Sequence, residues 1–198
     1  MGPLRIGFFY GTIAVIVALA ADLRFLFIDP REMPDWILTA IEEFRTQFAL
    51  TATVFFGILA AIRTRPTRFA PDVPYRSVLL RDCVLAATVV AVMAGFALFV
   101  TTALSATVFA DDIRAYADEA APSIVAYNEK VAGRLDDPPP LPGVAEIEED
   151  LQPPVLRDLG RSMANFVLRA LVVGAAGALV GLIRGRASPP DGPKPSRE

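Results

Sequence analysis

The sequence predicts an all-α integral membrane protein with four transmembrane helices and a small helical extracytoplasmic cap between the third and the fourth. Of its 198 residues, 54% are hydrophobic and the mean hydropathy is +0.45, which is more apolar than a typical soluble domain. The apolar residues are gathered into long runs, as in segments that cross a bilayer. The number of transmembrane helices falls to three if residues 1–20 are a cleaved signal peptide.

The first apolar run, residues 6–28, allows two interpretations. Arg5 precedes an apolar stretch that ends in the small residues Ala18-Leu19-Ala20, which is typical of a signal peptide cleaved before Ala21. However, the apolar character resumes at Leu23 and continues to residue 28. The complete run is close to the roughly 20 residues that span a bilayer. We therefore favour an uncleaved first transmembrane helix.

The next elements within residues 1–110 are two further transmembrane helices. A polar turn at 29–36 contains two prolines and ends in Trp36, a residue favoured at membrane interfaces. The second transmembrane helix is expected at about 37–62. Five arginines then lie between positions 63 and 81, which makes this the most basic loop. The third transmembrane helix is expected at about 78–108.

Residues 111–161 form the predicted acidic cap, with twelve acidic and five basic residues. Apolar residues from Ile113 to Leu135 recur at steps of three and four, which predicts one helical stripe. Pro122 interrupts this stripe and predicts a kink or a break between two helices. A proline-rich turn at 136–143 and a short helix from about Val144 to Leu151 complete a cap that folds back on itself.

The fourth transmembrane helix is expected at about 162–186, followed by a disordered cytoplasmic tail at 187–198. Asn165 and Arg169, near its start, are expected to anchor it at the interface. Its small residues are spaced four apart, a pattern that lets membrane helices approach closely. Their partner is left open between a helix of this chain and one of another protein. These helix-packing candidates are Ala170, Gly174, Gly177, Ala178 and Gly181.

The loop charges predict the orientation. Basic residues in short loops are retained on the cytoplasmic side, so the 63–81 loop and the arginines at 184 and 186 lie inside. The 29–36 turn and the acidic cap are then outside, and both termini are cytoplasmic. Only two of the 19 basic residues are lysine, a composition typical of GC-rich bacterial genomes. We therefore expect a multi-pass protein of the bacterial inner (plasma) membrane.

One group of ionisable residues lies close to the predicted outer boundary: Asp22, Arg24, Glu42, Glu43 and Arg45. If the first two helices form a hairpin about residue 32, Arg24 meets Glu42 or Glu43. Asp22 then reaches Arg45. Ionisable groups at membrane depth cost roughly 2.5–3.5 kcal/mol on insertion scales, so they usually pair or face water. The group is either a relay or ion-binding site or, the interpretation we favour, a salt-bridge cluster that fixes the hairpin.

Several chemistries lack their residues here. The absence of histidine excludes bis-His haem, His-bound copper or zinc, and Ser-His-Asp catalysis within this chain. Cys83 is the only cysteine, which excludes an intrachain disulfide and a cysteine-ligated cluster. No P-loop, dinucleotide-binding or zinc-protease motif is present. We predict no catalytic residue, no metal site and no cofactor, and the net charge of −3 indicates no nucleic-acid partner.

Three functions remain open. The first, which we favour, is a non-catalytic accessory or scaffold subunit of a bacterial inner-membrane complex. Its partners would be the lipid bilayer and other membrane subunits, contacted through the fourth transmembrane helix and the cap. The second is a small oligomeric transporter or pore, although the expected helix cores offer few polar residues to line a path. The third is a membrane-bound enzyme acting on lipid or peptide at the outer interface.

Overall fold

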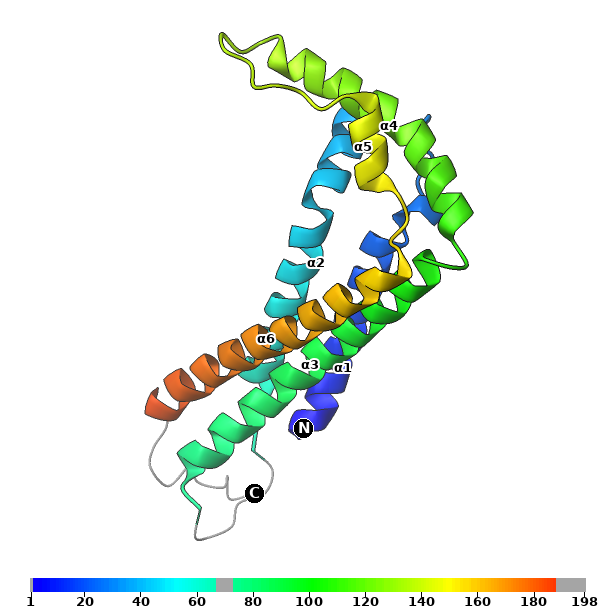
Figure 1. Cartoon of the computed structure of the whole chain (residues 1–198). Coiled ribbons are helices and arrows are strands. Elements are labelled where there is room, and N and C mark those ends of the chain that lie inside the picture. Colours follow the sequence, from blue (N-terminus) through cyan, green and yellow to red (C-terminus); the bar gives the residue numbers. More distant parts are fainter. Residues whose placement is uncertain (1, 67–72, 188–198) are drawn as a thin grey trace.

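The computed structural model describes residues 2–66 and 73–187. Within these ranges the chain is helical and has no strand, which confirms the predicted all-α class. Figure 1 shows an elongated molecule in which a bundle of long helices at one end is joined to shorter helices at the other. The tail predicted at 187–198 lies outside the described residues except for position 187.

Four helices are long and apolar enough to cross a membrane, as predicted. All four begin two or three residues earlier than expected, and the longest has 31 residues. At 1.5 Å per residue that helix is about 46 Å long, which exceeds the roughly 30 Å of a hydrocarbon core. The four helices are α1 (Pro3–Asp22), α2 (Asp35–Arg63), α3 (Tyr75–Ser105) and α6 (Leu159–Ala187).

The first helix is shorter than the apolar run suggested. α1 ends at Asp22, and the chain continues as the short 3-10 helix η1 (Arg24–Leu26). The apolar residues beyond this point have another use, because Phe25 and Ile28 pack against a core formed with α4 and α2. The prediction of one helix over 6–28 was therefore wrong, since hydropathy does not distinguish a lipid-facing run from one that enters a protein core.

Helix α3 is the centre of the bundle, and α1, α2 and α6 all pack against it. Two apolar clusters fill the contacts: one joins α1, α2 and α3, and the other joins α2, α3 and α6. Most of their buried side chains are alanines, and glycines supply the closest approaches. A Cβ at Gly7, for example, would lie 2.8 Å from the Val89 Cβ. Small side chains thus set the helix spacing.

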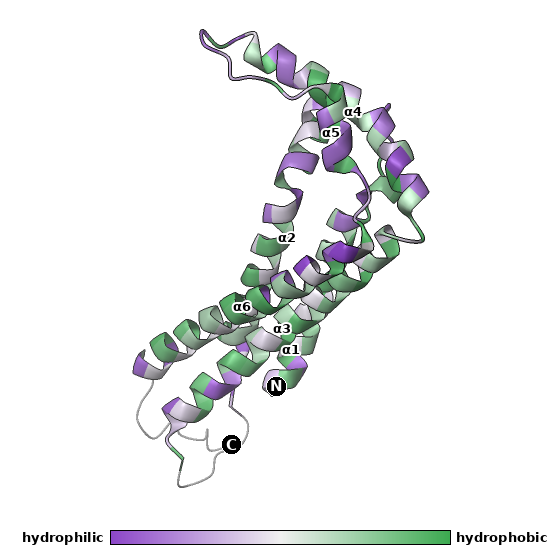
Figure 2. Cartoon of the chain, in the orientation of Figure 1, coloured by the Kyte–Doolittle hydropathy of each residue, from purple (hydrophilic) through white to green (hydrophobic). Residues whose placement is uncertain are grey.

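Large apolar side chains cover the outside of the four long helices. Figure 2 shows this part as mostly hydrophobic and the opposite end as mostly hydrophilic. Phe9 on α1, Phe96 on α3 and Leu171 on α6 are each more than 60% exposed. A water-facing surface seldom carries so many large apolar groups together.

The end of α2 is held to α3 and α6 by bonds to one carbonyl. Arg184 Nη1 donates a hydrogen bond of 2.7 Å to the Ala61 carbonyl oxygen, and Cys83 Sγ donates to the same oxygen at 3.3 Å. Cations are favourable at helix carboxyl ends, where carbonyls lack intrahelical partners. Arg184 therefore helps to fix the α2–α3–α6 packing.

The segment between α3 and α6 contains α4 (Ala110–Ala132), α5 (Val144–Leu151) and the 3-10 helix η2 (Leu156–Asp158). α4 continues through Pro122 and curves along its length in Figure 1, so the predicted break does not occur. Pro122 is exposed, on the side of the helix away from the core. The prolines at 138–140 lie in the non-helical stretch before α5.

α4 and α5 pack on the first turns of α2 rather than on the bundle. Leu38 of α2, fully buried, contacts Tyr116, Ala120 and Ile124 of α4, and residues of α5 and η1 complete the cluster. α2 therefore takes part in two cores, one in the bundle and one with α4 and α5. Between these cores lie the charged residues singled out in the sequence.

Candidate functional site

Arg24 and Glu42 form an ion pair between η1 and α2. Arg24 Nε and Nη2 donate to the two carboxylate oxygens of Glu42, and the exposed fractions of the two side chains are only 7% and 8%. This bidentate geometry matches the guanidinium fork to the carboxylate plane. Of the two partners considered for Arg24, the structure selects Glu42, and the pair joins η1 to α2.

Tyr116 adds α4 to this pair. Its hydroxyl donates a 2.7 Å hydrogen bond to Glu42 Oε1, and the Arg24 guanidinium carbon lies 5.6 Å from the centre of its ring. Sequence reasoning placed Tyr116 only on the apolar stripe of the cap. No local spacing signals this contact, because 74 positions separate the two residues. The Arg24–Glu42–Tyr116 triad therefore connects η1, α2 and α4.

The environment of Tyr116 favours its neutral form. Burial, followed by the charge of Glu42 and the hydrogen bond to it, raises the pKa of Tyr116 above its usual value. As the pH rises past about 10, the unfolded chain ionises this phenol while the folded chain does not. The contribution of the Tyr116 phenol to the free energy of unfolding is therefore fully present below pH 10 and is lost as the pH rises further.

Replacing Tyr116 by phenylalanine tests this link. We expect the variant to be about 1.5 kcal/mol less stable at pH 7, because Glu42 loses one donor. The difference should shrink between pH 7 and 11, because the variant has no phenol to ionise at this position. Circular dichroism of denaturant unfolding in detergent would measure both quantities. Tyr127→Phe on the same helix should keep the wild-type pH dependence, and a difference that does not vary with pH would contradict the assignment.

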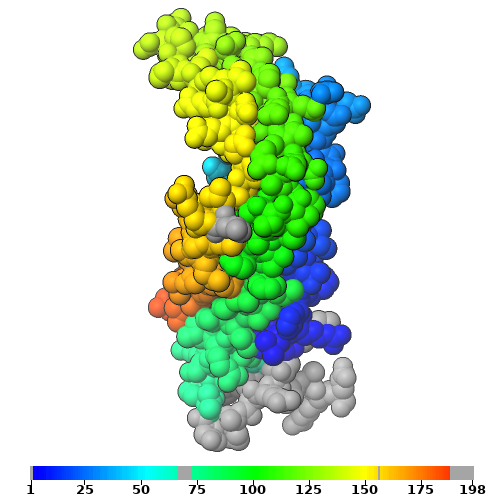
Figure 3. Space-filling model, turned by 45° about the vertical axis from the view of Figure 1, so that its right-hand side comes forward, coloured from blue at the N-terminus to red at the C-terminus, as the bar shows by residue number. Residues whose placement is uncertain are grey.

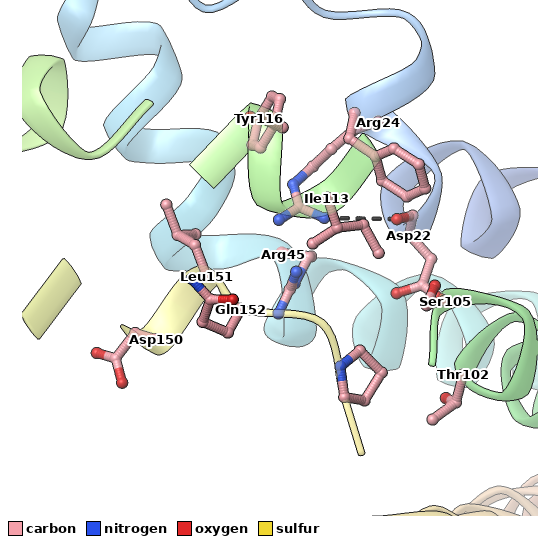
Figure 4. Close-up of a pocket in the computed structure, with 12 residues that line it drawn as sticks. Asp22, Arg24, Arg45, Thr102, Ser105, Ile113, Tyr116, Asp150, Leu151 and Gln152 are labelled. Carbon is pink, nitrogen blue, oxygen red and sulfur yellow. Dashed lines mark hydrogen bonds between the residues drawn. The ribbon is translucent and has the colours of Figure 1, made fainter. Parts of the chain in front are cut away.

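Asp22 and Arg45 line a cavity of about 230 Å³ beside the triad. Figure 4 places the Arg45 side chain between Leu151 and Gln152 on one side and Asp22 and Ser105 on the other. Among the described residues the two charges are not within ion-pair distance, although they do interact electrostatically. The ion pair considered for them in the sequence is therefore absent, and a polar cavity lies between their helices.

A second cavity, of about 200 Å³, shares Asp22 and Thr102 with the first. Its other polar residues come mainly from α6: Ser162, Asn165 and Arg169. Thr102 Oγ1 and Ser162 Oγ are 3.4 Å apart, across the α3–α6 contact. Arg169 interacts electrostatically with Asp22. The residue expected to anchor α6 at an interface thus faces the same carboxylate as Arg45.

Glu43 lies apart from this group. It is exposed on α2 and lines a third cavity, of about 390 Å³, together with Glu42, Arg45 and residues of α4 and α5. Within the described chain it forms no ion pair. Of the five ionisable residues, two are paired, two face a shared cavity and Glu43 is solvent-exposed.

The small residues of α6 contact α3 of the same chain. A Cβ at Gly177 would lie 2.6 Å from the Ala87 Cβ, and one at Gly181 would lie 2.9 Å from the Leu80 Cα. Gly174 is looser, at 3.3 Å from the Thr88 hydroxyl oxygen. Ala170 packs against the α2–α3–α6 cluster, and Ala178 is half-buried. An intrachain partner thus accounts for the glycines of this row.

The site offers fixed guanidinium groups and hydroxyls rather than metal ligands. Within residues 2–66 and 73–187, no group of three or more His, Cys, Asp or Glu side chains is placed to hold a metal ion. By its fold the chain is an all-helical protein with four helices suited to crossing a membrane. Comparisons with protein-family models, curated proteins and solved structures find no match to it.

Proposed function

We propose that the chain is a multi-pass protein of the bacterial inner membrane, with both termini in the cytoplasm and α4 and α5 forming an extracytoplasmic cap. The exposed apolar side chains of α1, α3 and α6 support insertion, because a bilayer is the environment that covers such a surface. The arginines that follow α2 and end α6 support the orientation, since basic loops stay inside. The acidic α4–α5 segment then lies on the opposite side.

Within that membrane we propose a non-catalytic accessory or scaffold role. The observation that carries it is the Arg24–Glu42–Tyr116 triad, which fixes α4 to α2 and to η1; α5 packs on α4. The far end of this segment exposes Leu135, Leu141 and Val144. A rigid, anchored segment with an apolar end is suited to contact another subunit.

A transporter or pore has less support from the packing. The interior between the four long helices is filled by apolar side chains, mostly alanine, and glycines bring the helix backbones close together. The buried Thr53 hydroxyl donates to the Ala49 carbonyl of its own helix, so it offers little to a permeating solute. A conducting path needs polar groups or water along its length. The polar residues that line the cavities described above lie at one end of the bundle.

Site-specific photo-crosslinking tests the accessory role. A photoreactive residue at Leu135 or at Leu171 of α6, both exposed, is expected to capture the same second polypeptide in the native host membrane, at high yield. The matched control is Phe9 of α1, which is also exposed and should crosslink only to lipid. Mass spectrometry of the products identifies the partner. Only lipid adducts or copies of this chain at all three positions would refute the role.

A further inference from the structure

The two cavities that share Asp22 and Thr102 contain an excess of positive charge. Arg45 lines one and Arg169 lines the other, while Asp22 is the carboxylate common to both. Arg24 and Glu42 neutralise each other in their ion pair. Asp150 also lines the first cavity, but its side chain is exposed, so water and salt screen its charge. The enclosed groups therefore leave one net positive charge.

Both guanidinium groups have unused hydrogen-bonding capacity. Among the described residues neither Arg45 nor Arg169 donates a hydrogen bond or forms an ion pair, yet neither side chain is fully exposed. Among the described residues, every side-chain nitrogen or oxygen that is fully buried has a hydrogen-bond partner. The nitrogens of Arg45 and Arg169 have none in this part of the chain, so they are not fully buried. The free nitrogens of both arginines must therefore be accessible from the cavities rather than sealed in the packing. Partly buried cations of this kind attract an anionic ligand.

Hydroxyl and amide groups supplement the two cations. Thr102 contributes to both cavities, Ser105 to the first, and Ser162 and Asn165 to the second. These groups come from α3 and α6, which the glycine contacts hold at a fixed separation. Guanidinium groups with hydroxyl donors around them are typical of sites for phosphate oxygens.

The second cavity is open between α2 and α6. Thr46 of α2 and Asn165 of α6 both line it and are both exposed. Figure 3 shows a recess between α5 and the first turns of α6, in which part of α2 is visible. Arg169 lies inside α6, and exposed apolar side chains of that helix occur on both sides of it, among them Val167 and Leu171. The opening is therefore near the end of the apolar surface, from which a long guanidinium side chain can extend toward the level of lipid phosphates.

We propose that these joined cavities bind a phosphate group, with Arg45 and Arg169 as its cationic ligands and Thr102 between them. One net positive charge matches a singly charged phosphodiester. The same chemistry has two sources, the headgroup of an anionic phospholipid and free inorganic phosphate. The negative charge of Asp22 repels the anion and limits its affinity. Removing this charge should therefore strengthen binding, whereas removing the arginines should weaken it.

Binding to the purified full chain in mild detergent tests the proposal. We would measure phosphatidylglycerol, a phosphate-free diglucosyl lipid with the same acyl chains, and inorganic phosphate by native mass spectrometry and by the shift in Tm. We expect phosphatidylglycerol to bind at least about tenfold more tightly than the glycolipid, a difference of one decade in Kd. Inorganic phosphate that competes with the lipid would identify free phosphate as a source; without competition the source is the headgroup.

Variants give the decisive comparison. Arg45→Gln with Arg169→Gln should weaken phosphatidylglycerol binding about tenfold or more, whereas Asp22→Asn should tighten it several-fold. Arg114→Gln, which removes an exposed guanidinium of α4, should change nothing. If the glutamine variant does not fold, lysine at both positions keeps the charges but loses the fork and should bind more weakly. Unchanged binding in the arginine variants, or weaker binding in Asp22→Asn, would overturn the proposal.

Discussion

Replacing Glu42 by alanine is expected to lower the free energy of unfolding by about 3–5 kcal/mol. The substitution leaves the Arg24 guanidinium buried, at 7% side-chain exposure, without the carboxylate that neutralises it. It also removes the acceptor of the Tyr116 hydroxyl. Both groups then pay a desolvation cost that no other contact replaces.

Glu43→Ala is the matched control for this prediction. The two glutamates are adjacent on α2, but Glu43 is exposed and forms no ion pair within the described chain. Its loss should change stability by less than about 0.5 kcal/mol. Denaturant unfolding in mixed micelles, followed by circular dichroism, compares the two. Equal effects of both substitutions would show that the ion pair does not stabilise the fold.

An apolar replacement of the whole triad distinguishes two causes of lost stability. One is a buried charge left without its partner, and the other is the loss of the contact itself. Arg24→Met, Glu42→Leu and Tyr116→Phe together remove both charges and the hydroxyl. Buried ion pairs are often replaced by apolar side chains with little loss. We therefore expect this triple variant to be more stable than Glu42→Ala alone. The triad would then act mainly to specify how α4 docks on the hairpin, in line with the proposed scaffold role.

The hairpin geometry explains which contacts of the site were predictable. A turn centred near residue 32 places Arg24 opposite Glu42, and the structure pairs them. The same argument put Asp22 beside Arg45, but there a cavity lies between the helices. Tyr116 and Arg169 reach the site from α4 and α6, and Tyr116 is 74 positions from its partner Glu42. Contacts between elements so distant in sequence leave no local periodicity to read.

Hydropathy identified the four long helices but not where each apolar run changes its role. Phe25 and Ile28 continue the apolar run of α1 and yet pack against the core beneath α4. Pro122 was expected to kink or break the helix of the cap. The helix does not break there, because proline removes one backbone donor without forbidding the helix, and α4 curves along its length instead (Figure 1). The surrounding contacts of Ala120 and Ile124 keep α4 in place.

The close packing of α3 and α6 leads to the second large effect, at Gly177. A Cβ there would lie 2.6 Å from the Ala87 Cβ and 3.0 Å from the Cys83 carbonyl oxygen. Neither neighbour is the end of a flexible side chain, so the helices themselves must separate. We expect Gly177→Ala to cost about 1–3 kcal/mol of unfolding free energy, despite the higher helix propensity of alanine.

Gly160→Ala on the same helix is the control, because a Cβ there meets nothing within 4 Å. Only the difference in helix propensity between glycine and alanine then affects stability, so this variant should be as stable as the wild type or slightly more stable. The opposite signs of the two substitutions distinguish tight packing from a general response of α6 to alanine. If Gly177→Ala is also neutral, α3 and α6 do not approach as closely as their contact at Ala87 requires.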